Sequence, residues 1–133
     1  MIQGEENTEV RQQEMPKSLS VERTFKRDVS DFQEVKREAE DAASELIRRV
    51  KSSGLAFRVT GVKIRFRGFE THTREKTLLS HTDSEAALFE TVDFLLEEFK
   101  REERPVRLVG VRVADLIRAT AESRRLDEWS GRS

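Results

Sequence analysis

Residues 56–69, AFRVTGVKIRFRGF, decide the fold class. Over the second half of this stretch apolar and cationic residues alternate strictly, in the order Val62, Lys63, Ile64, Arg65, Phe66 and Arg67. Because successive side chains of a β-strand point to opposite faces of a sheet, this period of two predicts a strand with one buried face and one cationic face. Gly68, just beyond the alternation, favours a turn or a bulge.

Three neighbouring segments also have the character of strands. Residues 70–80, ETHTREKTLLS, are rich in threonine, and they predict a strand paired antiparallel with the first through a short turn. Residues 18–26, SLSVERTFK, place apolar side chains on one side and the polar residues Ser18, Ser20, Thr24 and Lys26 on the other. Residues 106–113, VRLVGVRV, are β-branched and apolar, which is typical of a central strand.

Two amphipathic helices are predicted between these strands. The first has apolar residues at helical spacing from Phe32 to Val50 and is closed by Gly54; Ser30 and Gln33 form a capping-box pattern before it. The second has apolar residues at the same spacing from Leu88 to Phe99, stops before Pro105, and is preceded by a similar pattern at Thr82 and Glu85.

The resulting order, β-α-β-β-α-β, predicts an α+β fold of two layers. We expect a four-stranded antiparallel sheet with both helices on one face and the other face open. Residues 1–16 are polar and end in a proline, which indicates a flexible linker. Residues 17–117 then form the domain, and residues 118–133 form a C-terminal tail. The stretch from Ala114 to Ser133 is helix-like where it begins and polar where it ends.

Composition excludes several classes of protein. The chain has 133 residues, no cysteine and two histidines, and its 25 basic residues nearly balance 26 acidic ones. A disulfide framework, a thiolate zinc site and a thiol nucleophile are therefore excluded, and the apolar runs are too short for a membrane span or a signal peptide. We expect a cytoplasmic protein that binds no membrane and needs no cofactor of its own.

The charges are segregated along the chain. Residues 56–80 carry six bases and two acids, and residues 104–112 carry three bases and no acid, whereas residues 82–103 carry eight acids and two bases. The predicted strands are thus basic and the second helix is acidic. Cations and hydroxyls on an open sheet face suit phosphate groups, so duplex DNA is the first hypothesis for a partner. The alternative is a charged face that only keeps an exposed sheet soluble.

Other functions fit the residues less well. An RNA-recognition motif needs aromatic side chains on its central strands; Arg67-Gly68-Phe69 opens like that motif, but Glu70 and Thr71 follow. Acidic pairs on the second helix are typical of a solvated helix face, and His72 and His81 are typical of surface histidines. We therefore predict no catalytic residue and no metal site in this chain.

Three separated segments together resemble a known family: KSLSVERTF (17–25), GVKIRFRGFETHTREKTL (61–78) and RPVRLVGVRVADL (104–116). In this order they are similar to the C-terminal little-finger domain of Y-family DNA polymerases of the polymerase IV type. The resemblance covers roughly residues 4–117.

The resemblance implies a domain that lies in the major groove of primer-template DNA, beside the palm, fingers and thumb of the same polymerase. Translesion synthesis by the parent enzyme would use magnesium, and this chain alone would not polymerise. The matching positions imply phosphate contacts from four groups of residues: Ser18, Ser20, Thr24 and Lys26; Thr73, Arg74, Lys76 and Thr77; Arg107 and Arg112; and, with the face argument above, Lys63, Arg65 and Arg67. Leu108 stands where some members of the family carry a second arginine.

Members of the family commonly end in a short peptide that binds a sliding clamp. Leu126-Asp127-Glu128-Trp129 resembles a degraded form of it, with Leu126 as the aliphatic anchor and Trp129 as the aromatic one. Ser123 and Ser130 stand where a glutamine and a second aromatic are expected. Packing of Trp129 on the domain, or its position in a disordered tail, is an equal alternative. A protein-interaction module that docks a clamp or another polymerase domain, through this tail or the acidic helix, is therefore the second hypothesis.

Overall fold

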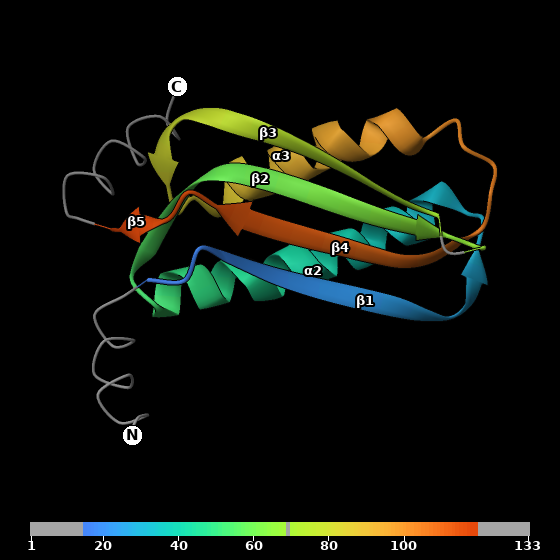
Figure 1. The fold of residues 1–133 in the computed structure, drawn as a ribbon, viewed down its shortest axis with the longest axis horizontal. Helices are drawn as coiled ribbons and strands as arrows, with labels where there is room; N and C mark the ends of the chain where they lie inside the picture. The colour runs from blue at the N-terminus through green and yellow to red at the C-terminus, as the bar shows by residue number, and fades with distance from the viewer. Residues whose placement is uncertain (1–14, 69, 120–133) are drawn as a thin grey trace, which may run out of the picture.

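The protein is a single sheet with two helices packed on one side of it (Figure 1). The computed structural model describes residues 15–68 and 70–119. Its long elements are β1 (Ser18–Val29), α2 (Phe32–Ser52), β2 (Leu55–Phe66), β3 (Thr71–Thr82), α3 (Glu85–Leu96) and β4 (Val106–Ala114). The predicted α+β class and the β-α-β-β-α-β order are confirmed.

The strands run in the order β1-β4-β2-β3, and all neighbours are antiparallel. Only β2 and β3 are joined by a hairpin, whose turn contains Gly68 at φ 92°. The first and last long strands lie side by side, with Ser18 opposite Ala114, so the chain enters β1 and leaves β4 at the same end of the sheet. The prediction of a central position for β4 is confirmed.

The caps of both helices lie one or two residues later than predicted. The carboxylate of Asp31, not the hydroxyl of Ser30, accepts the N–H of Gln33 at 3.0 Å and caps α2. The hydroxyl of Ser84, not that of Thr82, accepts the N–H of Ala87 at 3.1 Å and caps α3. In each case two cap-forming residues stand close together, and the one that leaves a free N–H within reach becomes the cap. Helix α3 ends at Leu96, and a 3-10 turn, Glu97–Phe99, follows it.

The prediction of a helix-like start to the tail is wrong. Asp115 adopts a positive φ of 55°, which turns the chain after β4, and Ile117–Arg118 then form a short strand, β5, against the start of β2. The N–H of Ala119 donates to the carbonyl of Gly54 at 2.8 Å. Pairing with β5 satisfies backbone groups of β2 that lie beyond the reach of β4. The remainder of the tail, from residue 120, lies outside the described residues.

The core lies between the sheet and the helices. Helix α2 buries an apolar stripe that includes Ala39, Leu46 and Val50, and β2 presents Val62, Ile64 and Phe66 toward it. These three strand residues are at most 2% exposed. Neither helix of the described part of the chain has the length and apolarity needed to cross a bilayer.

Candidate nucleic-acid interface

The helix-free face of the sheet is organised in rows of four residues, one from each long strand. Paired residues of neighbouring strands point to the same face, so the register defines each row. One row reads Glu22, Gly110, Lys63 and Thr73, and the next reads Ser20, Arg112, Gly61 and Glu75, both in the order β1-β4-β2-β3. Beyond them lie Ser18, Thr77, Thr24 and Arg65 on the same face.

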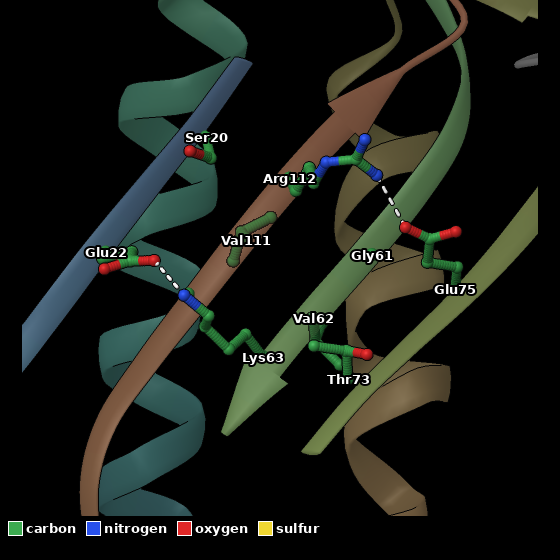
Figure 2. Close-up of a pocket in the computed structure, with 10 residues that line it drawn as sticks. Ser20, Glu22, Gly61, Val62, Lys63, Thr73, Glu75, Val111 and Arg112 are labelled. Atoms are coloured by element: carbon green, nitrogen blue, oxygen red, sulfur yellow. Dashed lines mark hydrogen bonds and ion pairs between the residues drawn. The ribbon is translucent and has the colours of Figure 1, made fainter. Parts of the chain in front are cut away.

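Each of the two central rows contains an ion pair that crosses a glycine. The carboxylate of Glu22 accepts from Lys63 at 2.6 Å across Gly110, and that of Glu75 accepts from Arg112 at 2.6 Å across Gly61. Figure 2 shows the two pairs side by side, one reaching inward from each edge of the sheet. The second row therefore repeats the first in reverse order.

The glutamate side chains lie directly over the two glycines. A β-carbon at Gly61 would stand 3.0 Å from Cγ of Glu75, and one at Gly110 would stand 3.1 Å from Cγ of Glu22. Their absent side chains also leave a shallow hollow of about 160 Å³ between the ion pairs (Figure 2). Both glycines and the four charged residues of the ion pairs line this hollow.

At the far end of the sheet, Asp28 holds two further predicted residues. Its carboxylate accepts from Nε of Arg67 at 2.9 Å and lies 3.7 Å from Nε of Arg107. The register of β1 against β4 shifts between Thr24 and Val29, and a bulge of this kind redirects the side chains of the strand. Lys26 lies in this irregular segment and is exposed.

Two predicted residues of β3 lie on the other side of the sheet. Nε of Arg74 donates to Glu98 at 2.7 Å, and its guanidinium stands 5.4 Å from the ring centre of Phe99. The ammonium of Lys76 stands 5.1 Å from the ring centre of Phe94 on α3. Arg74 and Lys76 thus contact the helix layer, while Thr73 and Thr77 of the same strand face the open side.

Arg23 of β1 also points to the helix layer. It donates to Glu45 at 2.7 Å and to Asp41 at 3.2 Å, both on α2. The hydrogen bond from Arg23 and its positive charge hold the pKa of the Glu45 carboxyl below its ordinary value. This pair ties the edge strand to the helix and leaves Arg23 out of the open face.

The structure thus gathers eight of the predicted residues on one face: Ser18, Ser20, Thr24, Lys63, Arg65, Thr73, Thr77 and Arg112. It places Arg67 and Arg107 at the end of that face on Asp28, and Arg74 and Lys76 behind it. Leu126 and Trp129 lie outside the described residues. The face is less cationic than the alternation of β2 alone suggests, because Glu22 and Glu75 enter it from the edge strands.

Sequence reasoning did not assign any role to Glu22, Glu75, Gly61 or Gly110. Glu22 and Glu75 have the same parity as the predicted polar residues of β1 and β3, and Gly61 and Gly110 have the same parity as Lys63 and Arg112. This shared parity is the signal that the sequence carries. It could be recognised only with the cross-strand register, which sets a glycine opposite each glutamate.

Each of the two histidines lies against a carboxylate near the surface. His72 contacts Glu70 at 2.7 Å and packs edge-on against Phe66, and His81 lies 3.4 Å from Asp115. The strong hydrogen bond from Arg104, followed by that from His72, keeps the pKa of the Glu70 carboxyl below its ordinary value. Within residues 15–68 and 70–119 no three acidic or histidine side chains cluster as they would around a metal ion.

The fold and the site together define a class of protein. It is a two-layer α+β domain with cations and hydroxyls on the open face of its sheet. The sequence pattern of the impB/mucB/samB family C-terminal domain matches residues 16–127, and the chain therefore belongs to this family. The DNA polymerase IV of Methanoculleus marisnigri is 33% identical over 129 residues, which are 97% of this chain and 36% of that protein. The DNA polymerase IV of Staphylococcus aureus is 29% identical over 117 residues, 88% of this chain and 33% of that protein.

Solved structures agree with the family. A little-finger domain of polymerase IV, determined in complex with the beta-clamp processivity factor, is 31% identical with a TM-score of 0.59; the match covers 73% of this chain and 86% of that domain. A Y-family DNA polymerase chimera matches at 18% identity with a TM-score of 0.68, over 78% of this chain and 30% of that one, and shows the shared fold. The resemblance to the little finger is confirmed. The chain spans about a third of the length of the curated relatives it matches.

Proposed function

We propose that this chain is a non-catalytic DNA-binding domain that grips the primer-template backbone in the major groove. The observation that carries the proposal is the shared open face, where hydroxyls of both edge strands flank the cations of β2 and β4. Ammonium and guanidinium groups bind phosphate oxygens, and serine and threonine hydroxyls hydrogen-bond to them. Such contacts position a protein on DNA and do not select a sequence.

The residue types on this face favour contact with the phosphate backbone of DNA over contact with its bases. The phenylalanines of the described strands, Phe25, Phe57 and Phe66, belong to the core or pack against it, so none offers its ring on the helix-free face. A stacking platform for unpaired bases needs exposed rings on the central strands. Duplex DNA is therefore the better partner for this face than single-stranded RNA.

We propose further that the domain acts during translesion synthesis within a polymerase that carries palm, fingers and thumb. The chemical step of such an enzyme would take place in the palm, where magnesium ions would stabilise the attacking and leaving oxygens of nucleotide transfer. In this arrangement the domain contributes duplex affinity and no catalytic group. Residues 1–16 would be the tether to the thumb, and residues 17–117 the DNA-binding unit.

Duplex binding is tested by removing the cations of β2. We expect Lys63→Ala/Arg65→Ala/Arg67→Ala to weaken binding of every duplex sequence alike, by roughly 100-fold at 0.1 M salt, because each lost phosphate contact removes about 0.9 from the slope of log K against log salt. Fluorescence anisotropy with a labelled primer-template across a salt series measures both quantities. The matched control is Arg37→Ala/Arg48→Ala/Lys51→Ala, which removes the same charge from exposed positions of α2.

The control should change affinity by less than about threefold, since these charges lie on the far layer. Equal losses in the two triple variants would show that only net charge matters, and an unchanged salt slope would remove the three β2 residues from the interface. Unlabelled single-stranded RNA of the same length should compete poorly.

A second candidate function is docking to a sliding clamp. The solved polymerase IV little finger that resembles this chain was determined with a beta-clamp, and Leu126 and Trp129 have the spacing of two anchors one helical turn apart. Tail binding and sheet binding use separate parts of the sequence, so the two functions are compatible.

Truncation of the chain before residue 123 should abolish capture of this chain by an immobilised bacterial beta-clamp. Trp129→Ala should weaken capture by about 30-fold, the usual cost of a buried aromatic anchor at an interface. Removal of residues 130–133 alone leaves both anchors in place and serves as the control. Capture that survives the longer truncation would move the docking site to the folded domain.

A further inference from the structure

We propose that Glu22 and Glu75 occupy two phosphate-binding subsites, at Lys63 and Arg112, and are exchanged for DNA phosphates when duplex binds. The proposal rests on the proposed DNA-binding function and names the two places where that function acts. Each subsite contains one cation, one hydroxyl residue from the neighbouring edge strand and one glycine as its floor.

The register builds the two subsites alike. Lys63 stands beside Thr73, and Arg112 stands beside Ser20, so each cation has a hydroxyl residue next to it in its row. The rows are two residues apart along the strands, which is about 7 Å, and this leaves room for two separate phosphate groups. Phosphate, like carboxylate, accepts short charge-assisted hydrogen bonds from both kinds of cation.

The glutamates are held loosely enough to leave. The side chains of the Glu22–Lys63 pair are 42% and 34% exposed, and those of the Glu75–Arg112 pair 53% and 43%. Pairs so exposed to solvent contribute little to stability. Both glutamates stand on edge strands, and rotation about their side-chain bonds carries the carboxylates out over the edge of the sheet, away from an arriving phosphate.

The two glycines also make the exchange possible, because they leave space beside each cation. Without β-carbons at Gly61 and Gly110, the path between the edge of the sheet and each cation stays open, and a phosphate can approach the floor now covered by glutamate methylenes. A carboxylate that must be displaced also lowers affinity for the polyanion. The two glutamates therefore occupy the phosphate positions in the free protein and also lower the affinity for duplex.

Glu22→Gln/Glu75→Gln tests the exchange, because glutamine keeps the size of the side chain and removes its charge. We expect duplex to bind about tenfold more tightly at 0.1 M salt and the salt slope to steepen by about 1 to 2, since two cations no longer carry an internal counter-charge. The control, Glu34→Gln/Glu90→Gln, makes the same change in net charge at exposed positions of the helices and should alter affinity by less than twofold. In the wild-type protein, the carboxyl carbon resonances of Glu22 and Glu75 should shift during titration with duplex, and those of Glu34 and Glu90 should not.

The outcomes separate this inference from the proposed function. If neither wild type nor any variant binds duplex at low salt, the DNA-binding function itself is overturned. If wild type binds and Glu22→Gln/Glu75→Gln binds with the same affinity and slope, or if the two carboxyl resonances do not move on binding, the exchange is overturned while the function stands. Tighter binding by this variant together with moving resonances supports both.

Discussion

Reversing the charge of the two central cations, in Lys63→Glu/Arg112→Glu, is expected to abolish duplex binding at 0.1 M salt, a loss of at least about 1,000-fold. The change removes both cations of the central rows and places four carboxylates around the hollow, two of them native. A phosphate brought to this face then meets repulsion where it met attraction. The measurement is anisotropy with the labelled primer-template, repeated at the lowest salt that keeps the protein in solution.

A charge-swapped variant separates binding from folding. The like charges created in this way lie two strands apart and are well exposed to solvent, so each pair should cost no more than about 1 kcal/mol. The reversed protein should therefore remain folded, which circular dichroism checks. Adding Glu22→Lys and Glu75→Arg to it restores both ion pairs with their polarity exchanged, and we expect binding to return to within about tenfold of wild type. Near-normal affinity in Lys63→Glu/Arg112→Glu would show that DNA does not use this face.

Phe66→Ala is expected to cause the largest loss of stability, about 3–5 kcal/mol. The ring is 1% exposed, lies 5.6 Å from His72 and 6.3 Å from Phe99 between ring centres, and is covered by the guanidinium of Arg104 at 4.2 Å. Truncation leaves a cavity where β2, β3 and the 3-10 turn after α3 meet. Since domains of this size are stable by only about 5–15 kcal/mol, the loss is a large share of the total.

Urea unfolding followed by circular dichroism measures this loss, and the transition midpoint should fall with little change in slope. Phe94→Ala is the matched control because Phe94 is 59% exposed and contacts Lys76 at the surface. It should cost less than about 1 kcal/mol. Equal costs for the two phenylalanines would contradict the packing described for the core.

The fold was predictable because its strongest patterns were local. Alternation through Val62, Ile64 and Phe66 identified β2, its buried face and hence the side on which the helices pack. The helix caps were misplaced by one or two residues because several adjacent side chains can cap, and only the backbone decides between them. The short strand β5 was missed because its partner, the start of β2, is some sixty residues away in the sequence.

The candidate site was predictable in composition but not in arrangement. Strand β3 carries polar residues on both faces, so no apolar pattern indicated that Arg74 and Lys76 turn toward α3. The counter-charges were hidden for a similar reason: Glu22 and Glu75 lie 41 and 37 positions from the cations they contact. Both features depend on the register between strands that are far apart in the sequence, and this register cannot be read from a single sequence.

The position of Ser18 opposite Ala114 also determines how the domain responds to mechanical pulling. Force that pulls Ser18 away from Ala114 acts first on this terminal pair, and then on each following pair of β1 and β4 in turn. Hydrogen bonds broken one after another resist far less than a ladder sheared all at once. Under such a load β1 and β4 therefore peel apart pair by pair, starting from this end of the sheet.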